Sequence, residues 1–416
     1  MLRGANNRRD ATHGPRLAVL PVGPFAVTEH LQKSLGAATT GEKAHRAPPP
    51  DAVRRRWRGC LLGGAVGDAL GAPVEFMSLA EIRERFGPAG VVDYTTAFDR
   101  QGAITDDTQM TLYTAEGLLR AHVKAALDGT ANVPVIASHA YARWLATQGN
   151  PSPLVDTTGD QGVLAGLEEL HARRVPGHTC IEALAAMPLL GTKARNDSKG
   201  CGGVMRVAPV GLFCARTPGT TDQRAARRAF DLGCELAALT HGHPTGQTAA
   251  GAFAAIVALL AREWEADEAI EEVLPLVVKR PLGSETRDAI GKAVALATQG
   301  TPSADRMASL GEGWIAEEAL AIAVYATLAA PDYTSGVLLA VNHDGDSDST
   351  GAIAGNLLGV LHGVENVPRK WLSGLELGTE IASIADDLAT WPDWPIGEFI
   401  EETEASNYWR TRYPPC

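Results

Sequence analysis

Apolar residues recur at steps of three and four along most of the chain from residue 55 onward, and this spacing is typical of helices that bury one face. Gly, Pro and Asn separate the periodic stretches. Alternating apolar and polar positions are rare, and 90–94 is the best strand candidate. The pattern therefore predicts one all-α domain of about ten helices or more, at 59–71, 108–127, 135–148, 160–173, 223–239, 246–264, 285–298, 315–329, 350–363 and 372–389.

The first fifty residues do not share this pattern. They have little apolar periodicity and end in three prolines at 48–50, which form a semi-rigid spacer. We expect residues 1–50 to be an extended or disordered arm and residues 51–416 to form the domain. No uncharged stretch reaches the roughly 20 apolar residues that a membrane helix needs. The longest, 241–261, begins as a polar loop and continues as a short buried helix, so we expect no membrane association.

Charge divides the chain in the same way. The 416 residues contain 37 Lys and Arg against 49 Asp and Glu, a net charge of −12, and 45% of them are hydrophobic. Residues 1–58 hold 11 basic and 4 acidic side chains, which leaves −19 on the rest. An acidic body lacks the basic surface that nucleic-acid binding requires, so no nucleic-acid partner is expected. Six cysteines without metal or redox spacing favour free thiols and a cytoplasmic location.

Two predicted helices carry glycine at every fourth position. A glycine inside a helix costs about 1 kcal/mol relative to alanine, so a repeated step needs a reason. The step places each set on one face, where another backbone can approach closely. We interpret both sets as tight helix packing, which would bring the ends of the two helices together; they are Gly59, Gly63, Gly67 and Gly71, and Gly351, Gly355, Gly359 and Gly363.

Two acidic clusters, 105–108 and 344–350, each lie directly before a predicted helix. One aspartate is enough to cap a helix, but adjacent aspartates repel one another unless a cation neutralises them. Carboxylate and hydroxyl oxygens without His or Cys suit Mg²⁺, Mn²⁺ or Ca²⁺ rather than zinc. The two clusters together therefore predict a binuclear oxygen-ligand site.

Three further segments are candidates for chemistry. Glu75 follows the proline that ends the first glycine-stepped helix, where a plain surface charge is the commoner outcome. The glycine-rich segment 199–206 could approach a phosphate but lacks the spacing of known nucleotide loops. The His-Gly-His-Pro segment 241–244 could equally be an ordinary hydrogen-bonded loop.

The motifs as a set closely resemble the ADP-ribosylglycohydrolase family, which includes dinitrogenase-reductase-activating glycohydrolases and ADP-ribosylarginine hydrolases. The resemblance runs in order from about residue 55 to the C-terminal tyrosines. It implies a compact all-α orthogonal bundle with two Mg²⁺ ions, or Mn²⁺, that removes ADP-ribose from a modified protein side chain, most resembling the arginine branch. The motifs are GCLLGGAVGDALGAPVEF (59–76), ITDDTQMTL (104–112), GCGGVMRVAPVGL (200–212), THGHPTG (240–246) and NHDGDSDSTGAIAGNLLG (342–359).

The resemblance also implies roles for single residues. Glu75 matches an acid that lies over the metals in relatives, and Glu75 or Asp107 would accept or relay the proton. The metal ligands would be Thr105, Asp106, Asp107, Asp346, Asp348 and Ser349, the last being often threonine in the family. The ADP-ribose contacts would be Gly202, Gly203, Met205 and His241.

Three alternatives remain open from the sequence. The chain could be a binding protein of the same fold, or a two-metal phosphohydrolase. It could also be an immunity protein that removes ADP-ribose and, through its N-terminal arm, binds a cognate ADP-ribosylating toxin directly. The modified side chain, the target protein and the oligomeric state are not predictable from the sequence.

Overall fold

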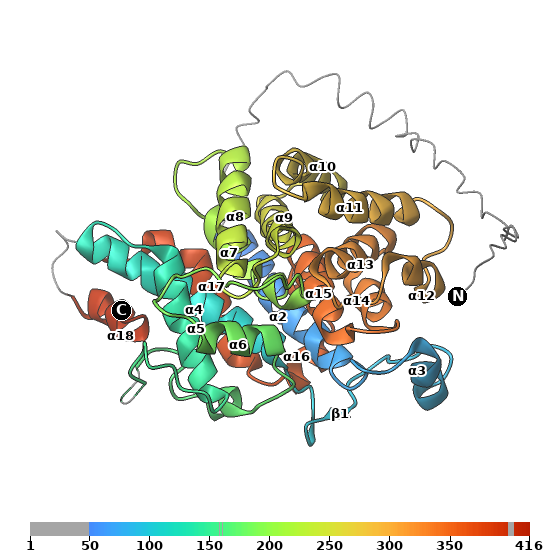
Figure 1. The fold of residues 1–416 in the computed structure, drawn as a ribbon, viewed down its shortest axis with the longest axis horizontal. Coiled ribbons are helices and arrows are strands. Elements are labelled where there is room, and N and C mark those ends of the chain that lie inside the picture. Colours follow the sequence, from blue (N-terminus) through green and yellow to red (C-terminus); the bar gives the residue numbers. More distant parts are fainter. Residues whose placement is uncertain (1–49, 158, 160, 398–402) are drawn as a thin grey trace, which may run out of the picture. The chain divides into compact units, whose positions relative to one another are not determined.

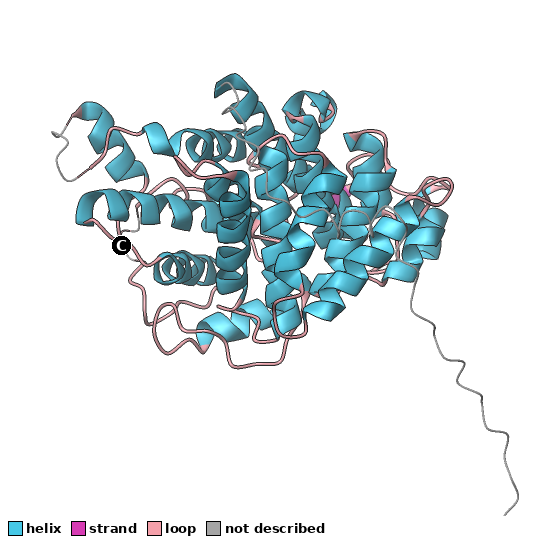
Figure 2. Ribbon diagram, turned by 90° about the horizontal axis from the view of Figure 1, so that it is seen from above, coloured by secondary structure: helices cyan, strands magenta, loops and turns pink. Residues whose placement is uncertain are grey.

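A computed structural model describes residues 50–157, 159, 161–397 and 403–416. Within them the regular secondary structure is almost all helical, as Figure 2 shows, with one two-stranded antiparallel hairpin that pairs Thr96 with Gln101 and Ala97 with Arg100. The predicted arm, residues 1–50, lies outside the described residues except at Pro50, where the first helix begins.

Seventeen α-helices lie in the described residues, so the all-α prediction is confirmed. Their bounds, with those of the strands, are α2 (Pro50–Gly71), α3 (Leu79–Phe86), β1 (Thr96–Ala97), β2 (Arg100–Gln101), α4 (Asp106–Asp128), α5 (Val133–Thr147), α6 (His178–Ala185), α7 (Ala208–Ala215), α8 (Asp222–Ala237), α9 (Pro244–Ala261), α10 (Ala266–Val277), α11 (Gly283–Ala297), α12 (Ala304–Met307), α13 (Ala316–Ala329), α14 (Tyr333–Val341), α15 (Ser347–His362), α16 (Arg369–Gly374), α17 (Gly378–Thr390) and α18 (Glu404–Arg412).

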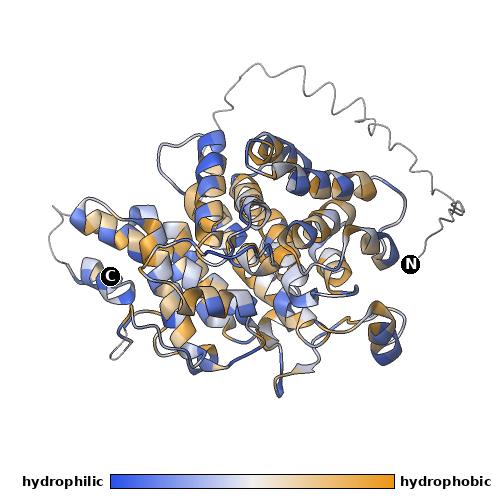
Figure 3. Cartoon of the chain, viewed as in Figure 1, coloured by the Kyte–Doolittle hydropathy of each residue, from blue (hydrophilic) through white to orange (hydrophobic). Residues whose placement is uncertain are grey.

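Helix α9 lies at the centre of the bundle and packs against α7, α8, α10, α13 and α15 (Figure 1). It is the one described helix long and apolar enough to cross a membrane, and 89% of it is buried inside the fold. Figure 3 shows α9 as mostly hydrophobic, whereas α8 at the surface alternates hydrophilic and hydrophobic residues. Burial on all sides thus accounts for the apolar composition of α9.

Three sequence predictions of local structure were wrong. The strand expected at 90–94 is a loop, because Val91 exchanges its backbone hydrogen bonds with the side-chain amide of Asn342 instead of with a strand. Among the described residues of 160–173, only Glu168–His171 forms a short 3₁₀ helix. Gly162 has a φ of +119°, which helices do not adopt, and the Val163 N–H donates to the Arg412 carbonyl.

The third error concerns the helix expected at 372–389, which is broken between α16 and α17. Leu377 has a φ of +53° at the break. The neighbouring Glu376 is buried there, and its N–H donates to the Gly102 carbonyl just before the first acidic cluster. The break therefore carries a charged side chain toward that cluster.

Candidate active site

The two glycine-stepped helices, α2 and α15, pack antiparallel along their glycine-stepped faces (Figure 1). A Cβ atom at Gly59, Gly63 or Gly67 would lie 2.1, 2.5 or 1.9 Å from the carbonyl oxygen of Gly359, Gly355 or Gly351, respectively. No side chain fits at such separations, so the expected tight packing is confirmed. At the end of this contact, Gly71 lies against the backbone of Ser347 and Asp348, which brings the C-terminus of α2 to the second acidic cluster.

The second cluster forms the first turn of α15. Asp346 is the N-cap, and its side chain accepts a hydrogen bond from the Ser349 N–H at 3.4 Å, which Asp348 also accepts at 3.0 Å. Glu75, just past the end of α2, reaches the same place: one carboxylate oxygen each of Glu75, Asp346 and Asp348 lie within 4.8 Å of one another. Glu75 is thus part of the acidic group rather than an isolated surface charge.

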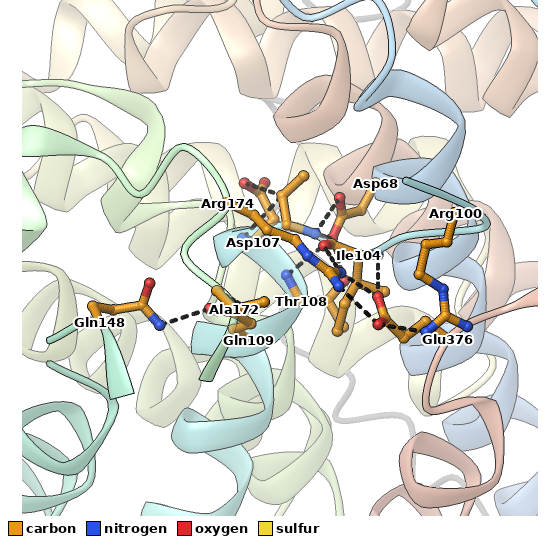
Figure 4. Close-up of polar contacts among 11 residues, drawn as sticks. Asp68, Arg100, Ile104, Asp107, Thr108, Gln109, Gln148, Ala172, Arg174 and Glu376 are labelled. Atoms are coloured by element: carbon orange, nitrogen blue, oxygen red, sulfur yellow. Dashed lines mark hydrogen bonds and ion pairs between the residues drawn. The ribbon is translucent and has the colours of Figure 1, made fainter. Parts of the chain in front are cut away.

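The first cluster forms the start of α4, with Thr105 as the N-cap. Asp68 of α2, to which the sequence analysis gave no role, fixes this turn from outside. Its buried carboxylate accepts hydrogen bonds from the Thr105 N–H at 3.0 Å and the Thr108 N–H at 3.1 Å, and from the Thr108 hydroxyl (Figure 4). The Gly-Asp pair inside a glycine-stepped helix was the available signal for Asp68.

The two clusters meet in one buried acidic group. Burial raises the pKa of Asp107 and of Asp106 well above the usual range, and charge repulsion from Asp348 raises it further. Burial and Asp348 also raise the pKa of Glu75 to about 10 and that of Asp68 to about 7. So many carboxylates gathered out of water destabilise one another unless protons or cations neutralise them.

The group fits a hard divalent cation. Asp107 Oδ1 and Asp346 Oδ2 are buried and have no hydrogen-bond partner within the described part of the chain, although buried oxygens normally have one. Mg²⁺ and Mn²⁺ prefer such carboxylate oxygens. The residues that could hold the ions are those expected from the sequence, together with Glu75. Their ligand roles stay predictions.

A loop that the sequence analysis missed holds the first cluster in place (Figure 4). The Gln109 side chain donates to the Ala172 carbonyl at 3.0 Å. Asp106 accepts from the Gly177 N–H at 3.1 Å, so α4 binds both ends of the loop 172–177. Between them Arg174 donates to the Ile104 carbonyl at 2.7 Å and pairs with Glu376.

Glu376 completes this arrangement from the break between α16 and α17. Its carboxylate accepts a hydrogen bond from the Ile104 N–H at 3.0 Å and also pairs with Arg100 at 2.7 Å. No sequence motif marked Arg174 or Glu376, because their partners are distant in the chain.

The glycine-rich loop lies beside the acidic group. The Ser349 hydroxyl contacts Cys201 Sγ at 3.6 Å and Met205 Sδ at 3.9 Å. His241, only 1% exposed, lies directly beneath Gly202 and Gly203, and Thr240 contacts its Nδ1 at 2.8 Å. Burial and then Arg206 lower the pKa of His241 to about 3, so the ring is neutral. In this structure His241 supports the loop, and substrate contacts of these residues stay a prediction.

Comparison with known proteins agrees with this geometry. The family model described as ADP-ribosylglycohydrolase matches residues 49–394. The chain belongs to the ADP-ribosylglycohydrolase family. Like other members it is therefore an enzyme that hydrolyses ADP-ribose linkages, which sets aside a purely binding role.

The similarity to individual members of the family extends over most of the chain. It is 27% identical over 333 residues to the ADP-ribosyl-[dinitrogen reductase] glycohydrolase of Rhodospirillum rubrum, covering 79% of this chain and 92% of that one. It is 23% identical over 368 residues to the ADP-ribosylarginine hydrolase Tri1 of Serratia proteamaculans, covering 84% and 86%. A solved structure titled ADP-ribosylglycohydrolase-related protein complex aligns with a TM-score of 0.58 at 26% identity, over 82% of this chain and 98% of that one.

Proposed function

We propose that this enzyme removes ADP-ribose from ADP-ribosylated arginine side chains of proteins in the cytoplasm and depends on Mg²⁺ or Mn²⁺. The observation that carries the proposal is the single buried acidic group that Glu75 and the two clusters form beside the glycine-rich loop. The names of the two bacterial relatives support a protein substrate and arginine as the modified side chain. Six free cysteines agree with a reducing compartment.

The reaction breaks the N-glycosidic bond between the ribose anomeric carbon and the guanidine nitrogen. A water molecule adds its oxygen to that carbon through an oxocarbenium-like transition state, and the guanidine leaves with a proton. Two bound divalent cations would hold the ribose hydroxyls, screen the anionic diphosphate from the acidic protein and lower the pKa of a bound water.

The chain's own residues then have distinct tasks. Asp107 is fully buried and contacts the Thr105 hydroxyl at 3.4 Å, which suits a fixed ligand. Glu75 lies in a segment between two helices and is half-buried, less enclosed than Asp107, which suits a group that meets the substrate. We therefore assign proton transfer to Glu75 and metal binding to Asp107.

Mass spectrometry of the products tests the activity. Peptides ADP-ribosylated on arginine or on serine are incubated with the enzyme and Mg²⁺, with EDTA as the control. We expect free ADP-ribose and unmodified peptide from the arginine substrate only, and only with the metal. Release of AMP or inorganic phosphate would instead indicate a two-metal phosphohydrolase.

The role of Glu75 has a separate test. Glu75→Gln should lower kcat by at least about a hundredfold, the lower end for lost acid-base catalysis, with an unchanged melting temperature in EDTA or a slightly higher one. Asp305→Asn, which alters an exposed carboxylate paired with Arg83, is the matched control and should leave kcat unchanged. Near-normal turnover of Glu75→Gln would contradict the assignment.

A further inference from the structure

The segment that carries Glu75 has an unusual side chain next to it. Between the end of α2 and the start of α3, Val74 is buried and anchors the backbone, whereas Phe76 is 68% exposed. The Val74 N–H donates to the Gly71 carbonyl at 2.8 Å and the Met77 N–H donates to Val74 at 2.9 Å, so the backbone makes two tight turns here. Exposure of so large an apolar ring beside a catalytic group requires an explanation.

Phe76 is stacked on another exposed aromatic side chain. Its ring centroid lies 5.7 Å from that of Trp314, with 17° between the planes, and Trp314 is 37% exposed. This is the offset-stacked geometry that aromatic pairs prefer. The two residues come from segments 238 positions apart, so the stack is a tertiary contact and not a result of local folding.

Trp314 belongs to a short segment before α13 that is hydrogen-bonded both to the glycine-rich loop and to the second acidic cluster. The Trp314 carbonyl accepts from the Cys201 N–H at 3.1 Å, and the Lys199 carbonyl accepts from the Ala316 N–H at 2.8 Å, which fixes the segment to the glycine-rich loop. The Glu312 carbonyl accepts from the Asp346 N–H at 2.9 Å, which fixes it to the second acidic cluster.

The Trp314 ring is held as well, because its Nε1 donates to Glu312 at 3.1 Å. Backbone and ring are therefore both anchored, and Trp314 presents a fixed surface toward Phe76. Phe76 has no comparable anchor of its own, since most of its ring faces solvent.

We propose that the stack of Phe76 on Trp314 positions Glu75 over the acidic group. When the rings are stacked, the neighbouring Glu75 is held with its carboxylate beside Asp346 and Asp348. When they separate, the segment 72–78 is still held at its two ends, by the Ala72 N–H on the Asp68 carbonyl and by the Ser78 cap of α3, but the turns between them open more often and Glu75 moves away from the reacting atoms. Phe76 and Trp314 are thus positioning residues, and their role in turnover rests on the function proposed for Glu75.

Hydrogen–deuterium exchange of the full-length, metal-free protein tests the positioning directly. An aromatic stack of this kind changes the opening equilibrium of its segment by about two- to tenfold. Phe76→Ala should therefore raise the exchange rates of the amides of 74–77 by that factor, and Trp314→Ala should do the same. Phe76→Tyr keeps the ring and should restore the slow exchange, and Leu189→Ala, at another exposed apolar position, should change nothing in 74–77. Unchanged exchange in Phe76→Ala would overturn the proposal.

Kinetics of a double-mutant cycle separates positioning from substrate contact. Phe76→Ala should lower kcat with little change in KM, and it should have no further effect when Glu75 is already Gln. A loss in KM that persists in the Glu75→Gln background would show that Phe76 binds substrate and would overturn the positioning role. If the wild type hydrolyses no ADP-ribosylated peptide, the proposed function fails, whereas the exchange experiment still decides the stack.

Discussion

An aspartate in the first turn of a helix ordinarily stabilises that helix, because it complements the positive end of the helix dipole. Asp348 occupies such a position in α15, yet it also raises the pKa of Glu75, Asp68 and Asp107 by charge repulsion. At the scale of the single residue, the buried carboxylates therefore lower the stability of the metal-free fold. Cations bound among them, as the proposed function requires, would offset that destabilisation.

The substitution Asp348→Asn tests this destabilisation. The amide oxygen can still accept from the Ser349 N–H, but one negative charge is lost. In EDTA we expect the melting temperature to stay the same or rise by about 1–3 °C, while Mn²⁺ binding measured by calorimetry and hydrolysis both fall by at least about a hundredfold. Asp305→Asn serves again as the surface control. Equal Mn²⁺ binding by wild type and Asp348→Asn would argue against the metal role of Asp348.

The pH dependence of the metal effect follows from the same shifts. The folded pKa of Asp68 (about 7) and of Glu75 (about 10) lies above the unfolded value near 4, so in EDTA their contribution to stability falls as pH rises from about 4 toward those values. Protons compete with metal for the same oxygens. The rise in melting temperature caused by Mg²⁺ should therefore be larger at about pH 8 than at about pH 5.

Comparing the Mg²⁺ and EDTA melts at each pH removes the contribution of the buried histidines. Burial lowers the pKa of His241 and His343 in the folded protein. Their protonation in acid therefore destabilises the protein equally in Mg²⁺ and in EDTA. A Mg²⁺ effect that is constant with pH would contradict the acidic group as the cation site.

At the scale of the helix, the stepped glycines of α2 and α15 determine how closely the two helix backbones approach each other. The four stepped glycines of α2 each meet a backbone carbonyl of α15, so the pair packs backbone to backbone. The side-chain amide of Asn356 adds one specific bond, donating to the Cys60 carbonyl at 2.8 Å. Because the helices approach so closely, Gly71 and Ser347 are in contact and the acidic residues beyond them share one site.

Gly63→Ala should therefore destabilise the fold. The new methyl would lie 2.5 Å from the Gly355 carbonyl oxygen, and overpacking of this kind costs about 1–3 kcal/mol. Gly291→Ala is the matched control, since its Cβ would meet nothing within 4 Å in the interior of α11. That change should stabilise by about 0.5–1 kcal/mol, because alanine suits a helix better than glycine. Urea unfolding measures both, and equal effects of the two substitutions would contradict the close-packing argument.

At the scale of the whole molecule, the family match begins at residue 49, one residue before α2. Residues 1–48 thus precede the matched domain and carry most of the basic excess. We expect deletion of residues 1–47 to leave the melting temperature and the turnover of a small ADP-ribosylarginine peptide unchanged. A large loss of either would show that these residues belong to the enzyme.

The same deletion tests the immunity hypothesis. Combined with Asp346→Ala, it separates hydrolysis from direct binding of a cognate ADP-ribosylating toxin. If the arm binds such a toxin, the full-length Asp346→Ala protein still inhibits it and the double variant does not. Inhibition that is equal in both variants, or absent from both, would remove the arm from the mechanism.

Most of the helices, the glycine faces and the acidic clusters were predictable because each pattern lies in residues that are close in sequence. Helical periodicity, a four-residue glycine step and aspartates at helix starts are local patterns, and they gave the fold class and the residues of the acidic group. The predicted strand at 90–94 and the helix at 160–173 were wrong because distant partners, Asn342 and the Arg412 carbonyl, took the backbone hydrogen bonds of Val91 and Val163.

The supports of the site depend on contacts between distant segments and have no sequence signature. Asp68 holds the start of α4, Glu376 and Arg174 hold Ile104 from a helix break and a loop, and Phe76 meets Trp314 across 238 residues. Such pairs form only when packing of the whole bundle brings their segments together, since nothing in their immediate neighbours favours one partner over another. The local pattern thus identifies the residues of the acidic group, and the packed fold selects those that hold them in position.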